Sequence, residues 1–190
     1  PVLFFSYDLD GRHNPLSMHG SCPVLQGEKW VAQQWFRVEP YAGSPYFQFL
    51  MPPADAKLRD EGAVQHPEEA ARPPPVLHDP SLLQVSFSPR VLLAEGFLSE
   101  EECEALKNMA APSLQGAMTV DRNTGASQLD NLRTNSQMYF NDRTRFEDPL
   151  VRAISDRMQT LARMPLGHSE PLQVGRYREG EFYQPHFDSE

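Results

Sequence analysis

The chain has 190 residues, enough for one domain with a hydrophobic core, and its 39% hydrophobic and 23% charged residues are ordinary for a globular protein. A formal charge of −9 argues against nucleic-acid binding, which normally requires a basic face, and is compatible with basic or neutral peptide partners. The N-terminal stretch turns polar at Ser6, too soon for a signal-peptide core or a membrane span, so neither is expected in this chain.

The two cysteines, Cys22 and Cys103, form neither a disulfide framework nor a zinc-binding pattern. A single bridge between them and two free thiols are both compatible with the sequence. The cysteines therefore leave the redox compartment open.

Residues 1–50 contain two predicted strands. Residues 1–8 are rich in Phe and Val and read as a buried strand, and residues 29–38 read as a second strand with aromatic content. Residues 9–18, between them, are typical of turns.

Residues 51–81 differ from the rest, because prolines stand among Asp, Glu, Lys, Arg and Ala. Such a charged, proline-rich stretch does not favour a packed element. We predict a linker here, which separates segment 1–50 from segment 82–190.

Segment 82–190 begins with two predicted strands, at 83–87 and 91–93. Ser99 and Glu102 have the spacing of a capping box, which predicts a helix running to about Met109.

A second helix is predicted after Asp148, an N-cap residue followed by Pro149. Its apolar face consists of Leu150, Ile154, Met158 and Leu161, and it ends before Pro165. Strands at 172–177 and 182–187 follow, joined by a turn at 178–181. Helices segregated from many short strands predict an α+β fold in which helices support a β-sandwich or barrel.

The segment that ends the chain contains His186 and Asp188, two residues apart in a predicted strand, so both side chains are expected on one face. Two histidines and one carboxylate are the usual ligands of oxygen-activating Fe(II), with further positions left open. A His-x-Asp pair alone is weak evidence, because such pairs also occur on ordinary surfaces.

A third candidate ligand, His19, lies near the other end of the chain, and Lys29 follows ten residues later. A lysine in an apolar barrel mouth needs an anionic partner, and the far carboxylate of 2-oxoglutarate would serve. The alternatives are a loop histidine without a ligand role and a solvated surface lysine.

These motifs together resemble the catalytic domain of prolyl 4-hydroxylases. The similarity rests on four stretches: Glu170 to Tyr177 with Gly180 and the Tyr183–Asp188 run; His19 to Val24 with Gly27 to Trp30 and Trp35; Phe97 to Cys103; and Arg133 with Thr134.

The resemblance implies a double-stranded β-helix (jelly-roll) core with supporting N-terminal helices. It also implies a dioxygenase that uses Fe(II), 2-oxoglutarate, O2 and ascorbate and hydroxylates peptidyl proline. It assigns iron to His186, Asp188 and His19, and 2-oxoglutarate to Lys29 and Tyr177.

It further implies that the peptide groove is lined by Arg133, Glu170, Tyr183 and Trp35. Packing is the alternative role for Trp35 and Tyr183. Asn135 stands where the family often has Ser, and Arg37 where a histidine can follow the strand tryptophan, so the peptide substrate is left open.

The order of the segments differs from the family pattern, in which the His-x-Asp segment comes first. Residues 1–50 resemble the C-terminal part of an oxygenase domain and residues 82–190 its N-terminal part, so the jelly roll is expected to be incomplete. A window on tandem domains, a circular permutation with deletion, and segments joined out of natural order each explain this. We expect the isolated chain to fold poorly or to self-associate through the edges left by the absent strands.

Two other functions remain open: a 2-oxoglutarate oxygenase with another substrate, and a non-catalytic peptide-binding fragment. The family resemblance suggests the endoplasmic reticulum or the secretory pathway.

Overall fold

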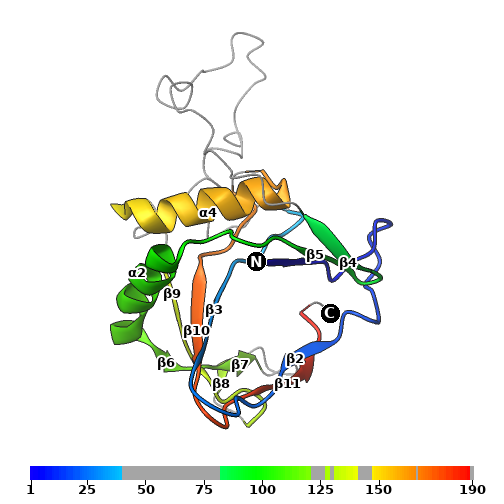
Figure 1. Cartoon of the computed structure of the whole chain (residues 1–190). Coiled ribbons are helices and arrows are strands. Elements are labelled where there is room, and N and C mark those ends of the chain that lie inside the picture. The colour runs from blue at the N-terminus through cyan, green and yellow to red at the C-terminus, as the bar shows by residue number, and fades with distance from the viewer. Residues whose placement is uncertain (40–81, 121–126, 129–130, 141–146, 166, 189–190) are drawn as a thin grey trace, which may run out of the picture. The chain divides into compact units, whose positions relative to one another are not determined.

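The computed structural model describes residues 1–39, 82–120, 127–128, 131–140, 147–165 and 167–188 (Figure 1). The chain divides into two compact units. The first comprises Pro1–Gln33, Pro80–Phe140 and Leu172–Glu190, and the second comprises Gln34–Asp79 and Asn141–Pro171. The linker predicted at 51–81 lies outside the described residues.

A four-stranded antiparallel sheet forms the centre of the first unit, in the order β3-β10-β9-β6. Its strands are β3 (Lys29–Gln33), β10 (Gln173–Tyr177), β9 (Ser136–Tyr139) and β6 (Gln115–Gly116). β10 (sequence Gln-Val-Gly-Arg-Tyr) pairs with β3 on one side and with β9 on the other. This central position leaves it almost wholly buried. The register sets Tyr177 opposite Lys29 at one end and Gln173 opposite Gln33 at the other.

The strand predicted at 29–38 is too long, because β3 ends at Gln33 and Gln34 begins the second unit. Beyond that point the backbone finds partners in residues 168–170. The amide of Arg37 donates to the His168 carbonyl at 2.8 Å, and the amide of Glu170 donates to the Trp35 carbonyl at 2.9 Å. The hydrophobic pattern continues past Gln33, but the pairing partner changes there.

A three-stranded sheet in the order β1-β5-β4 joins the N-terminal strand to two strands from the middle of the sequence. β4 (Leu83–Phe87) and β5 (Arg90–Leu93) confirm the predicted strands, whereas β1 spans only Val2–Phe4 instead of residues 1–8. The chain turns soon after β1, because the amide of Asp8 donates to the Arg12 carbonyl at 2.8 Å. The buried side chain of Asn14 then holds this loop by donating to the Asp8 carboxylate at 2.7 Å.

The two-stranded sheet of β2 (His19–Ser21) and β11 (Tyr183–His186) pairs strands from opposite ends of the sequence, drawn in blue and in red in Figure 1. His19 lies opposite His186. The close approach requires Gly20, since a Cβ there would lie 2.9 Å from the backbone oxygen of Tyr183. Because Gly20 has no side chain, β2 and β11 can approach each other closely beside His19.

Helix α2 (Glu100–Ala110) begins at Ser99, where both hydrogen bonds of the predicted capping box are present. It buries Leu106 and Ala110, and the short 3-10 helix η1 (Ala111–Ser113) follows it. A small hairpin of β7 (Thr119–Val120) and β8 (Ser127–Gln128) comes next.

Helix α4 (Pro149–Ala162) belongs to the second unit and is capped by Asp148 as predicted. Its buried side chains are Val151, Ile154, Ser155 and Gln159, so of the four predicted core residues only Ile154 is fully buried. The buried face is therefore rotated by about one residue from the predicted stripe. Within the described part of the chain, neither α2 nor α4 is long and apolar enough to cross a lipid bilayer.

Antiparallel sheets with separate helices confirm the α+β class and a β-rich core. The closed jelly roll remains a prediction.

Candidate metal centre and co-substrate site

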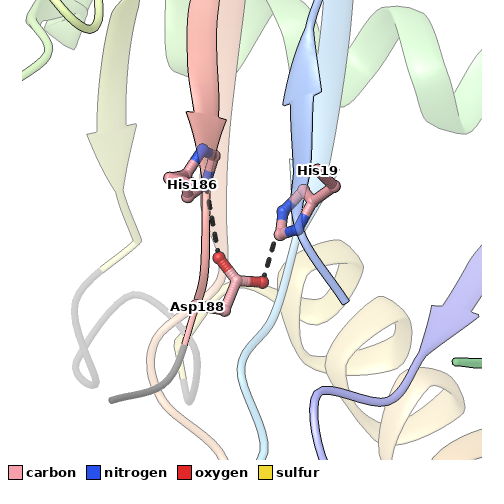
Figure 2. A group of neighbouring side chains, drawn as sticks. All are labelled: His19, His186 and Asp188. Atoms are coloured by element: carbon pink, nitrogen blue, oxygen red, sulfur yellow. Dashed lines mark ion pairs between the residues drawn. The ribbon is translucent and has the colours of Figure 1, made fainter. Parts of the chain in front are cut away.

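Three side chains that could together hold a metal ion converge in the first unit, as Figure 2 shows: His19, His186 and Asp188. Their ligand atoms all lie within 4.8 Å of one another. One carboxylate oxygen of Asp188 lies 3.4 Å from Nε2 of His186, and the other lies 3.4 Å from Nε2 of His19. The structure thus brings together the three predicted ligands, which come from opposite ends of the sequence.

Both histidines are oriented in the same way by the backbone. Nδ1 of His19 bonds to the Ser17 carbonyl at 3.1 Å, and Nδ1 of His186 bonds to the Gln184 carbonyl at 2.8 Å. Because a carbonyl oxygen only accepts, each Nδ1 must carry a proton, which leaves Nε2 as the ring atom that can bind a metal. A fixed tautomer of this kind is usual for metal-binding histidines.

Aromatic rings support the two imidazoles. The Tyr183 ring stacks on the His186 ring with centroids 3.6 Å apart, and the Phe4 ring meets the His19 ring edge-on at 5.0 Å. The side chains of His186 and Asp188 are only 18% and 16% exposed, and His19 is 38% exposed. The triad is therefore packed, with one side open to solvent.

The strand that carries His186 ends there, so Asp188 does not continue it as predicted. The chain bends after His186, and the ring of Phe187 packs edge-on against His13 at 4.8 Å. The carboxylate reaches the two imidazoles from this bend rather than from a regular strand face.

The donor set fits Fe(II). Two imidazole nitrogens and both oxygens of one carboxylate face the same small region, and these are the donor atoms that such a cation uses. A histidine–histidine–carboxylate triad occupies one side of the metal and leaves the remaining positions for oxygen ligands.

Beside this centre, Lys29 and Tyr177 lie opposite each other on β3 and β10. Nζ of Lys29 donates to Oγ of Ser21 and lies 4.6 Å from the centre of the Tyr177 ring. Lys29 is exposed, not enclosed by apolar side chains as expected, whereas Tyr177 is buried. Its ammonium group is therefore accessible to a ligand from solvent.

Burial raises the pKa of the Tyr177 hydroxyl, and the charge of Arg133 together with hydrogen bonds to Arg133 and Ser21 partly opposes this rise. The charge of Glu181 adds a smaller increase. The hydroxyl thus stays protonated at neutral pH and can donate a hydrogen bond to an anion.

The four predicted groove residues fall into two pairs, one in each unit. In the first unit the guanidinium of Arg133 lies 4.6 Å from the centre of the Tyr183 ring. In the second unit Glu170 bonds through its amide to the Trp35 carbonyl, and its carboxylate accepts from Nε of Arg37 at 2.6 Å. Arg37, which departs from the family pattern, is thus an ion-pair partner of Glu170.

Sequence comparison finds known proteins that are similar to this chain. Prolyl 4-hydroxylase 2 of Arabidopsis thaliana is 35% identical over 116 residues, covering 61% of this chain and 38% of that protein. Prolyl 4-hydroxylase 1 of the same plant is 40% identical over 104 residues, covering 55% and 36%, and its probable prolyl 4-hydroxylase 4 is 36% identical over 105 residues, covering 55% and 34%. Over more than half of its length the chain is therefore similar to prolyl 4-hydroxylases.

The chain spans less than two-fifths of the length of those relatives. No family model matches it.

Sequence reasoning missed Ser21, whose Oγ accepts a hydrogen bond from Nζ of Lys29. Its position two residues after His19, on the same face of a short strand, was the available signal. Both cysteines are free and exposed in the structure.

Proposed function

We propose that this chain is an Fe(II)- and 2-oxoglutarate-dependent dioxygenase that hydroxylates peptidyl proline, with O2 as second co-substrate and ascorbate as reductant. The observation that carries the proposal is the convergence of His19, His186 and Asp188 with both Nε2 atoms facing the carboxylate. In this proposal the core is part of a double-stranded β-helix, and the antiparallel sheets are consistent with it.

His19, His186 and Asp188 would hold the iron, which when bound supplies the activation of O2 needed to oxidise an unactivated C–H bond. The hydrogen bonds to the Ser17 and Gln184 carbonyls place a proton on each Nδ1 and fix the orientation of each imidazole. The stacked ring of Tyr183 limits rotation of His186.

Lys29 and Tyr177 would bind the far carboxylate of 2-oxoglutarate. Among the described residues, no acidic side chain forms an ion pair with Lys29, so its charge remains for a ligand. A lysine ammonium and a protonated phenol both donate to a carboxylate, and the hydrogen bond from a charged donor is the stronger.

Arg133, Tyr183, Trp35 and Glu170 would contact the peptide. Aromatic rings and planar polar groups recognise proline rings and backbone amides. Because Arg37 already pairs with the Glu170 carboxylate, that carboxylate is held in place in the second unit and is not a free charge.

The test is succinate release from 2-oxoglutarate with Fe(II) and ascorbate, with and without a proline-rich peptide. We expect the peptide to stimulate release and His186→Ala to abolish it, whereas His168→Ala, a histidine of the second unit, retains it. Turnover without hydroxyproline in the peptide would indicate another substrate. A folded, iron-binding chain without turnover would indicate a peptide-binding fragment.

A further inference from the structure

The loop of residues 8–17 is fixed by one buried side chain, that of Asn14, which is 1% exposed. Its Nδ2 donates to the Asp8 carboxylate at 2.7 Å and to Oγ of Ser88 at 2.9 Å, and its Oδ1 accepts from the Leu16 amide at 2.8 Å. Both amide protons and the carbonyl oxygen of this side chain are thus used. Because Ser88 lies between β4 and β5, these hydrogen bonds tie the loop to the three-stranded sheet.

The loop supplies the carbonyl that orients His19. The backbone amide of Ser17 donates to the Asn14 carbonyl at 3.0 Å, and the Ser17 carbonyl accepts from Nδ1 of His19 at 3.1 Å. Ser17 is itself buried. The position of the Ser17 carbonyl, and with it the direction of Nε2 of His19, therefore depends on how Asn14 holds the loop.

The same loop contacts the bend that carries Asp188. The ring of His13 packs edge-on against the ring of Phe187, with centroids 4.8 Å apart, and Nε2 of His13 lies 3.3 Å from Oγ of Ser17. Phe187 stands between the candidate ligands His186 and Asp188, at the point where the chain leaves β11. Because packing against His13 holds the Phe187 ring, it limits how the chain bends there and where the Asp188 carboxylate lies.

We propose that the loop of residues 8–17 is a positioning element of the metal centre, in which Asn14 and His13 are the positioning residues. Asn14 sets the direction of His19, and His13 sets the bend before Asp188. The inference rests on the proposed function, because it requires that the triad bind a metal ion, and it adds the residues that fix the geometry of that triad. Residues that orient metal ligands usually contribute strongly to metal affinity.

The test measures binding of Mn(II) to the full chain by electron paramagnetic resonance in matched pairs of variants. Asn14→Asp keeps the shape of the side chain but removes both donors and places a second carboxylate beside Asp8. The double variant Asp8→Asn with Asn14→Asp exchanges the two groups, so that an amide again donates to a carboxylate. His13→Ala removes the ring that contacts Phe187, whereas His13→Leu retains an apolar side chain there.

The control is Leu106→Val, because Leu106 is a buried side chain of helix α2 and lies outside the loop. Urea denaturation of each metal-free protein measures its free energy of unfolding. We expect Leu106→Val to lose stability but to keep the Mn(II) affinity of wild type.

We expect Asn14→Asp and His13→Ala to bind Mn(II) about tenfold more weakly than wild type, the low end of the usual effect of losing a residue that orients ligands. The exchanged double variant and His13→Leu should recover most of the affinity. The line shape at saturating Mn(II) depends on the arrangement of the ligands. It should change in the two weakened variants and stay as in wild type in Leu106→Val.

Two results with a wild type that binds Mn(II) would overturn the inference and leave the proposed function standing. The first is wild-type affinity in both Asn14→Asp and His13→Ala. The second is a loss of affinity that follows stability alone, so that Leu106→Val shows it too and neither matched variant recovers it. If Asn14→Asp does not fold, the two His13 variants decide in the same way. A wild type that binds no Mn(II) would overturn the proposed metal centre and this inference together.

Discussion

The two site histidines make the same local hydrogen bond, in which Nδ1 of each bonds to the carbonyl two residues before it in the chain. This hydrogen bond needs only an extended backbone at residues 17–19 and 184–186. It makes the tautomer a consequence of strand geometry rather than of a separate acidic partner.

Tyr177 gives a prediction about pH at the same scale. Because burial raises its pKa above that of an unfolded tyrosine, the neutral phenol stabilises the fold fully below about pH 10, and this contribution is lost as the pH rises through the folded pKa. We expect the free energy of unfolding of wild type to fall more steeply above pH 10 than that of Tyr177→Phe.

The matched control is Tyr7→Phe, since Tyr7 is 44% exposed. Urea denaturation at pH 9, 10 and 11 measures the three slopes. A Tyr177→Phe slope equal to those of wild type and Tyr7→Phe would show that the phenol titrates alike in the folded and unfolded chains.

At the scale of elements, the pairing of β2 with β11 decides whether the triad forms. Gly20→Ala places a methyl group against the Tyr183 backbone oxygen, at 2.9 Å if nothing moves. We expect a loss of about 1–3 kcal/mol of stability, because the obstructing atom is backbone and cannot rotate away.

The same substitution should weaken Mn(II) binding by separating His19 from His186. Titration with Mn(II) followed by electron paramagnetic resonance measures this, with the neighbouring exposed Cys22→Ala as control. Unchanged affinity in Gly20→Ala would mean that β2 and β11 need not pair closely to hold the metal.

What the sequence predicts well at this scale is local. The capping box at Ser99, the cap at Asp148 and the turn after Tyr177 depend on residues a few positions apart, and all are present. The predicted strands 1–8 and 29–38 were too long, because the observed ends at Phe4 and Gln33 depend on where a distant partner strand begins and ends.

The candidate site residues were also predicted from local sequence motifs. His19, His186, Asp188, Lys29 and Tyr177 lie in recognisable motifs. The hydrogen bonds from Lys29 to Ser21 and from Arg133 to Asn135 join residues close in sequence, but they depend on side-chain orientations that a sequence pattern does not give.

At the scale of the molecule, the segments predicted as the end of one domain and the start of another supply strands to the same sheets. β1 pairs with β5, β2 with β11 and β3 with β10. We retain as proposals the boundaries at 1–50, 51–81 and 82–190 and the three explanations of the segment order.

Self-association is also predicted at this scale. Edge strand β4 exposes apolar side chains along its length, with Leu83 60%, Val85 54% and Phe87 85% exposed. An exposed apolar edge invites pairing with another chain. We expect concentration-dependent oligomers of wild type in sedimentation velocity, and fewer with Phe87→Lys.

The control is Leu25→Lys, which removes an equally exposed apolar side chain from outside any strand. A monomeric wild type, or equal effects of the two lysine substitutions, would argue against association through β4.

The central claim is that ligands from opposite ends of this sequence build one iron site within a single chain. Anaerobic equilibrium dialysis against Fe(II) measures the metal bound by wild type, His19→Ala and His186→Ala. The account predicts one tightly bound Fe(II) per chain in wild type and its loss in both variants. Retention of the iron in His19→Ala, with loss only in His186→Ala, would contradict the pairing of the two segments at the metal.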